Sequence, residues 1–160
     1  MKKIIYKLTY LTALFALFYS CDDVERVYYN DGAETVLTLS DDNLVLNEEN
    51  AANEILTLTW TQPDFGFSAA ALYSVQIDVQ GGDFSNPQII SVGGAFDKTF
   101  TVEELNAKLL SLSMVPNEEG VASFRIKATL SEYQEIYSNT VNISVTPVSY
   151  THLRAHETHE

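Results

Sequence analysis

Apolar and polar residues alternate with a period of two along most of the chain between residues 34 and 147. The pattern is clearest in residues 54–61, where Leu56, Leu58 and Trp60 share one face and threonines occupy the other. Alternation of this kind predicts a half-buried β-strand, because successive side chains of a strand point to opposite faces. We therefore expect Trp60 in a hydrophobic core.

The same alternation recurs in three longer segments, residues 72–80, 121–130 and 136–146. The residues expected to point inward from them are Tyr73, Val75, Ile77, Val79, Phe124, Ile126, Ala128, Leu130, Val141, Ile143 and Val145. Shorter candidate strands lie at 35–40, 43–47, 88–92 and 96–100, separated by clusters of turn residues. About seven short strands predict two packed antiparallel sheets.

One segment has the period of a helix. Thr101 is followed three residues later by Glu104, which is the spacing of a capping box. Apolar residues then recur at helical spacing, at Val102, Leu105, Leu109 and Leu112. Pro116 prevents further extension. The whole pattern predicts an all-β, immunoglobulin-like or fibronectin-like sandwich at residues 34–147, with one crossover helix between two strands.

The first 20 residues have the layout of an export signal. They contain a basic start, an apolar run and a small residue, namely Lys2, Lys3 and Lys7, then residues 8–19, then Ser20. A secretory signal requires those three parts. The competing interpretation is a transmembrane anchor, which requires about 20 apolar residues, whereas this run is shorter and follows Lys7.

Cys21 is the only cysteine of the chain and follows the signal directly. A buried thiol is the alternative to acylation, but Asp22, Asp23 and Glu25 do not bury readily. We expect Cys21 to become the lipid-bearing N-terminus, with residues 21–33 as a polar tether. Acidic residues after such a cysteine resemble either an inner-membrane retention signal or a surface-export signal.

Charge argues against several classes of partner. Residues 21–147 contain 5 basic and 20 acidic residues, a net charge of −15. Such a charge repels nucleic acid and anionic lipid, so the lipid on Cys21, rather than a basic patch, would hold the protein at a membrane. The acidic clusters lack the ligand spacing of an EF-hand, so we expect solvated turns and no metal site. Nothing in the sequence requires a cofactor.

The last residues, 148–160, differ in character from the rest. All three histidines lie there, yet no histidine or second cysteine earlier in the chain completes a metal site. This segment resembles translated adapter sequence at the end of a gene fragment. We expect it to be a non-native tail, with the natural protein continuing beyond it.

Exposed aromatic side chains are the usual platforms for sugars. Phe65 and Phe67 lie in a predicted loop after Pro63 and are weak glycan-binding candidates, although closing the end of the core is the commoner role of such residues. No nucleophile motif or phosphate-binding loop is present. The sequence therefore favours a binding protein over an enzyme.

Several segments, in order along residues 21–147, resemble the N-terminal domain of SusE-type outer-membrane lipoproteins. They are Leu56-Thr57-Leu58-Thr59-Trp60, Asp64-Phe65-Gly66-Phe67, Tyr73 with Val75-Gln76-Ile77-Asp78, Phe84-Ser85-Asn86-Pro87, the region 98–106, Arg125-Ile126-Lys127-Ala128 and Tyr137-Ser138-Asn139-Thr140-Val141. The resemblance implies an immunoglobulin-like domain on the outer face of the outer membrane, in a system that captures starch or related glycans. It favours the surface-export interpretation of Asp22, Asp23 and Glu25.

Two functional hypotheses follow. In the first, this segment is the lipid anchor and spacer of a surface glycan-capture lipoprotein whose sugar-binding domains lie downstream. In the second, it is a scaffold that docks on a transporter or another surface protein without contacting glycan.

Overall fold

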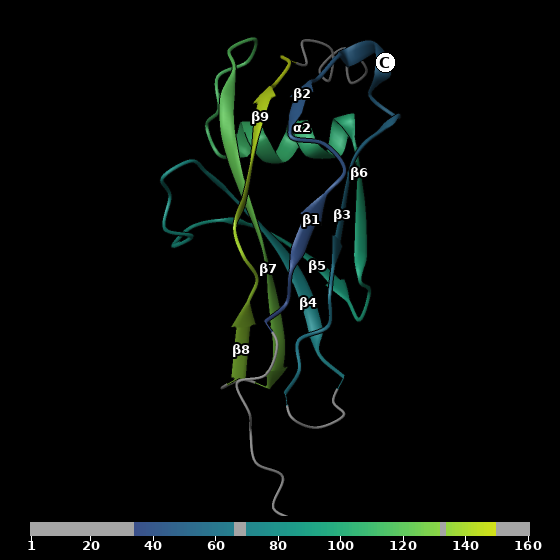
Figure 1. The fold of residues 1–160 in the computed structure, drawn as a ribbon. Coiled ribbons are helices and arrows are strands. Elements are labelled where there is room, and N and C mark those ends of the chain that lie inside the picture. Colours follow the sequence, from purple (N-terminus) through teal and green to yellow (C-terminus); the bar gives the residue numbers. More distant parts are fainter. Residues whose placement is uncertain (1–33, 66–69, 132–133, 150–160) are drawn as a thin grey trace, which may run out of the picture.

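A computed structural model describes residues 34–65, 70–131 and 134–149. Two β-sheets pack face to face, and one helix lies at one end of them (Figure 1). The smaller sheet has the order β1-β3-β6, formed by Leu37–Leu39, Glu54–Trp60 and Asp97–Thr101. The larger sheet has the order β2-β9-β7-β4-β5, formed by Asn43–Val45, Val141–Thr146, Gly120–Ser131, Leu72–Val79 and Gln88–Gly93. β8, Gln134–Tyr137, also pairs with β7.

The first two strands belong to different sheets. β1 pairs antiparallel with β3, and the chain then crosses to place β2 parallel to β9. Asp41 stabilises the bend between them, because its carboxylate accepts hydrogen bonds from the backbone N–H groups of Asp42 and Asn43. The sandwich is thus antiparallel, as the alternation predicts, except at this one pair.

The core lies between the sheets. Leu56, Leu58 and Trp60 all point into it, and Trp60 is 5% exposed. Tyr73, Val75 and Ile77 face them from β4, and Phe124, Ile126 and Ala128 from β7. The predicted sandwich and the core position of Trp60 are confirmed, because period-two burial places alternate residues of each strand on one inner face.

The predicted crossover helix is confirmed as α2, Val102–Ser111, between β6 and β7. The Thr101 hydroxyl caps it by accepting a hydrogen bond from the Glu104 N–H at 3.2 Å. Val102, Leu105 and Leu109 are buried against the sheets. A short 3-10 helix, η1 (Glu48–Asn50), lies near α2 where the sequence predicts only a turn.

The predicted last strand, residues 136–146, is wrong as a single element. Lys127 of β7 opposes Tyr137, but Phe124 opposes Val141, so the pairing register against β7 shifts by one residue between β8 and β9. The Ser138 hydroxyl accepts a hydrogen bond from the Ile126 N–H at 2.8 Å, replacing a backbone acceptor. The side-chain amide of Asn139 then bonds the backbone N–H and C=O of Leu37 in β1.

The described chain enters and leaves the sandwich at different ends (Figure 1). At the first end, the Val36 N–H donates to the Thr61 hydroxyl at 2.9 Å. At the other end, the Asn106 side chain of α2 bonds both the N–H and the C=O of Val148, at 2.9 and 2.8 Å. Val148 therefore packs with the domain, although the sequence analysis assigns it to the tail.

Candidate functional site

Most of the residues predicted from the sequence to carry function lie outside the part of the chain that the structure describes. Cys21, Asp22, Asp23, Glu25 and Phe67 lie outside the described residues, so their predicted roles stay predictions. Phe65 is 1% exposed and belongs to the hydrophobic core. This burial agrees with the commoner role of closing the end of the core, and the glycan-binding role considered for Phe65 stays a prediction.

The most distinctive arrangement of polar and aromatic side chains lies on the outer face of the larger sheet. The guanidinium of Arg125, from β7, lies over two aromatic rings, with its Cζ 4.1 Å from the ring centre of Phe84 and 4.2 Å from that of Tyr137. Its Nε donates to the Gln76 side-chain oxygen at 2.7 Å. We call Gln76, Phe84, Arg125 and Tyr137 the stacked-arginine site.

A second layer of contacts fixes Tyr137. Its hydroxyl donates to the Glu135 carboxylate at 2.8 Å, and Glu135 also pairs with Lys127. The hydrogen bond from Lys127 lowers the pKa of Glu135 most, and the hydrogen bond from Tyr137 lowers it further. The carboxylate in turn raises the pKa of Tyr137 above its ordinary value, and partial burial adds to the effect. The ring of Tyr137 is therefore held in one orientation beside Arg125.

Phe84 reaches the site from the loop after β4, in a backbone conformation that non-glycine residues rarely adopt, with φ of 56°. The buried carboxylate of Asp78 holds it there by accepting from the Phe84 N–H at 2.9 Å. A Cβ on Gly82 would lie 2.4 Å from an oxygen of Asp78, so only glycine leaves room for this carboxylate. The loop thus maintains local strain to position one aromatic ring.

The outer face around this site is partly covered. Gln76 and Asp78 are only 5% and 8% exposed, although they sit on the outward side of β4 where alternation predicts solvent. Arg125 and the loop carrying Phe84 cover them. Tyr137 remains 38% exposed, and Ile89, which opposes Gln76 on β5, is 59% exposed.

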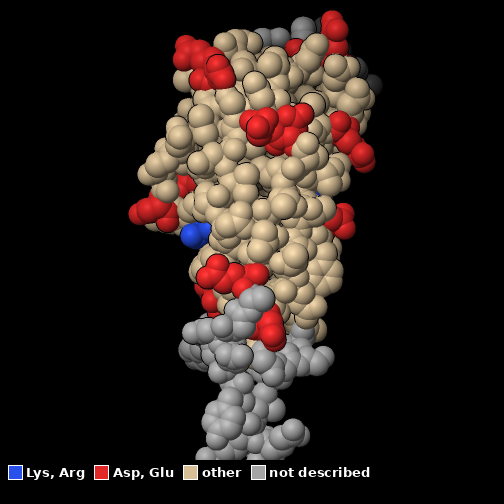
Figure 2. Space-filling view, in the orientation of Figure 1, with Lys and Arg blue, Asp and Glu red and all other residues tan. Residues whose placement is uncertain are grey.

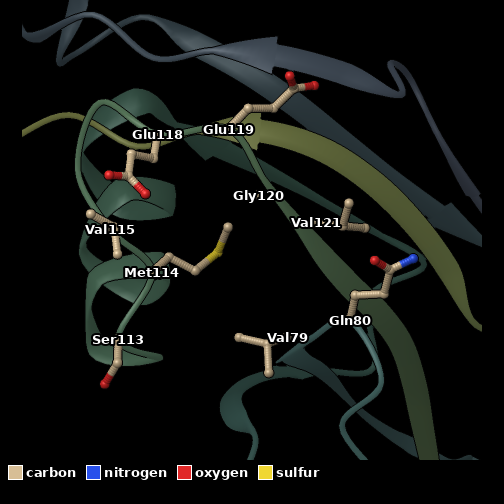
Figure 3. Close-up of a pocket in the computed structure, with 9 residues that line it drawn as sticks. All are labelled: Val79, Gln80, Ser113, Met114, Val115, Glu118, Glu119, Gly120 and Val121. Carbon is tan, nitrogen blue, oxygen red and sulfur yellow. The ribbon is translucent and has the colours of Figure 1, made fainter.

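A separate open groove lies at the end of the sandwich, near the C-terminus of α2 (Figure 3). It has a volume of about 320 Å³. Met114 points into it between Val79 and Val121, and Glu118 and Glu119 lie at its rim (Figure 3). Gly120 lacks the Cβ that would meet the end of Met114. This groove holds few convergent polar groups, so its shape reflects packing of the 113–120 loop.

Other kinds of site find no support in the part of the chain that the structure describes. There, no group of three or more His, Cys, Asp or Glu side chains could hold a metal ion. Likewise, no helix among residues 34–65, 70–131 and 134–149 is long and apolar enough to cross a membrane.

Comparison with known families identifies the chain. The profile of the SusE outer membrane protein family matches residues 22–127, which includes every strand from β1 to β6 and most of β7. The chain belongs to the SusE outer membrane protein family. It is thus an outer-membrane protein of the Sus glycan-utilisation system, in a family of surface binding proteins rather than known enzymes.

Solved structures similar to this SusE-family chain are β-sandwiches. A computationally redesigned β-sandwich protein is 14% identical, with 72% of this chain and 91% of that chain covered and a TM-score of 0.40. The periplasmic chaperone SfaE is also 14% identical, with 72% and 58% covered and a TM-score of 0.34. No curated protein matches the chain.

Sequence reasoning missed the stacked-arginine site. The segments that carry the family resemblance contain Gln76, Phe84, Arg125 and Tyr137, but nothing in them assigns a role to any of the four. The available signal was an arginine on the outward side of a strand that is otherwise predicted to be solvated. No local pattern predicts that the Phe84 ring lies beside Arg125, since this placement depends on a loop conformation.

Proposed function

We propose that this SusE-family chain is a surface-exposed outer-membrane lipoprotein of a starch-like glycan-capture system. In this proposal, lipid on Cys21 anchors the chain and the sandwich of residues 34–147 is a spacer. Glycan-binding domains follow it in the natural protein. The Cys21 proposal is supported by the signal pattern before that residue.

The observation that carries the spacer role is the position of the two ends of the domain. The first described residues bond to Thr61 at one end of the sandwich, and Val148 bonds to Asn106 in α2 at the other. Because the chain enters at one end of the domain and leaves at the other, the length of the domain separates the segment before it from the segment after it. That geometry suits a module that holds a binding domain away from the membrane.

The first experiment tests the anchor. Cells expressing the full chain are labelled with a clickable fatty acid, and the protein is examined for incorporated lipid and for cleavage by protease added to intact cells. We expect Cys21→Ser to lose both the lipid and the outer-membrane fraction. We expect replacement of Asp22, Asp23 and Glu25 by alanine to keep the lipid but lose surface exposure.

Ser20→Ala serves as the matched control, since alanine is also a small residue at the cleavage position. An unlabelled wild-type protein that remains soluble in the periplasm would contradict the proposal.

A membrane pull-down distinguishes the glycan-capture proposal from the docking alternative. Recovery of a transporter by a chain that is correctly lipidated but binds no glycan favours a scaffold.

A further inference from the structure

We propose that the stacked-arginine site binds a neutral oligosaccharide, so that this domain contacts glycan itself as well as spacing other domains. The inference rests on the glycan-capture function proposed above and adds to it a site and a ligand class. It starts from the hydrogen-bond donors that Arg125 leaves available.

A guanidinium has five N–H donors in one plane. In Arg125 the Nε donor is used by Gln76, while the ring centres of Phe84 and Tyr137 lie 4.1 and 4.2 Å from its Cζ. The ion pairs of the described residues join Lys98 to Glu104 and Lys127 to Glu135 and do not engage Arg125. The donors on its two terminal nitrogens therefore remain for an in-plane acceptor.

The surroundings match what a sugar presents. A pyranose offers adjacent hydroxyl oxygens as acceptors along its edge and C–H groups on its face. Sites for small ligands combine aromatic surface with a few fixed polar groups. Tyr137 is 38% exposed and Ile89 is 59% exposed, so apolar surface lies on either side of the Arg125–Gln76 pair.

The residues of the site also have partners before any ligand arrives. Tyr137 is held by Glu135, Phe84 by Asp78, and Arg125 by Gln76 and the two rings. Fixing side chains in advance lowers the entropy lost on binding. The strained backbone of Phe84 is consistent with this, because such strain is concentrated where a structure positions functional groups.

Charge selects among the possible ligands. The domain, residues 34–147, contains 16 acidic and 4 basic residues, a net charge of −12, and acidic side chains extend over the face shown in Figure 2 while basic ones are scarce. A uronate-bearing glycan or an acidic peptide would be repelled during its approach. A neutral oligosaccharide is not, and it can still accept hydrogen bonds from Arg125.

The full chain, purified in detergent, is titrated with maltoheptaose, cellohexaose, mannohexaose and oligogalacturonate by calorimetry. We expect saturable binding of at least one neutral oligosaccharide. Arg125→Gln should weaken it by about tenfold or more, the effect of losing about 1.4 kcal/mol of interaction. Lys108→Gln, which changes the charge equally on α2, should leave the affinity unchanged.

A measurement on the unmodified chain covers the case in which Arg125→Gln fails to fold. The same sugar should shift the NMR signals of the Arg125 Nε–H and the Tyr137 ring. No neutral binding up to about 10 mM, preference for oligogalacturonate, equal binding by both variants, or shifts confined to other surfaces would each overturn the inference. Lipidation and surface exposure are read independently, so the spacer function can survive this result.

Discussion

Ser113 holds a left-handed backbone conformation at the end of α2, with φ of 64°. Its N–H bonds the C=O of Leu110, and the Met114 N–H bonds the C=O of Leu109, which together form a Schellman motif. The position usually occupied by glycine therefore carries a side chain, at a cost of about 1 kcal/mol.

We predict that Ser113→Gly raises the free energy of unfolding by up to about 1 kcal/mol, because glycine adopts this conformation without steric cost. Urea denaturation followed by circular dichroism measures the change. Ser111→Gly is the matched control. It makes the same substitution inside the last helical turn and removes a hydrogen bond to Ala107, so it should destabilise by about 1 kcal/mol. Equal effects at the two positions would contradict this explanation.

Tyr137 gives a pH-dependent prediction. Its pKa is raised, chiefly by the hydrogen bond to Glu135, so the folded state favours the protonated phenol. The resulting stabilisation is complete below the ordinary tyrosine pKa of about 10 and is lost as pH rises through the higher folded-state value. NMR titration of the tyrosine ring carbons should show Tyr137 ionising late. In Glu135→Gln its pKa should fall toward the ordinary value, and an unchanged curve would refute the assignment.

Among the elements, the long strands and the helix could be predicted because each carries its own periodic signal. The alternation in β3, β4 and β7 reflects burial of one face, and Thr101 with Glu104 marks the start of α2. The break between β8 and β9 could not be predicted, since it depends on Ser138 and Asn139 bonding distant backbone groups. The alternation continues on both sides of that break.

The candidate site was unpredictable for a similar reason. Gln76, Phe84, Arg125 and Tyr137 come from three strands and a loop, and only pairing of β7 with both β4 and β8 brings them together. The register in which β7 pairs with β4 and β8 therefore determines whether these side chains meet. Local sequence predicts that Arg125 and Gln76 face outward, but not that two aromatic rings cover the guanidinium.

The junction between α2 and the end of the domain gives a prediction at the level of elements. Asn106 is fully buried and bonds both backbone groups of Val148. Asn106→Ala should lower the free energy of unfolding by about 2–4 kcal/mol, because it removes two hydrogen bonds and leaves backbone groups without partners. Thermal and urea unfolding measure the change in the free energy of unfolding. As a control, Asn86→Ala at an exposed position should change it by less than about 0.5 kcal/mol.

A truncation after Pro147 provides the second arm of that experiment. It removes the backbone that Asn106 binds, so Asn106→Ala should have a much smaller additional effect in the shortened chain. Fully additive losses would show that Asn106 acts through packing in α2 alone. In that case the exit of the chain would not be fixed to the helix.

For the molecule as a whole, charge works against compactness. Residues 21–147 carry 20 acidic and 5 basic residues, and only two ion pairs, Lys98–Glu104 and Lys127–Glu135, join the described side chains. Exposed pairs of this kind contribute about 0–1 kcal/mol each. Repulsion among the remaining carboxylates therefore dominates the long-range electrostatics of the folded domain.

Added salt should consequently stabilise this protein. Raising NaCl from about 10 mM to about 0.5 M shortens the Debye length from about 30 Å to a few ångströms, which screens the repulsion between distant carboxylates. We expect the Tm at pH 7 to rise by several degrees, and Glu118→Gln, which removes one charge from an acidic pair, to reduce the rise. An equimolar series with KCl separates ionic strength from a sodium-specific effect. A Tm that falls with salt would mean that attractive pairs outweigh repulsion in the folded state.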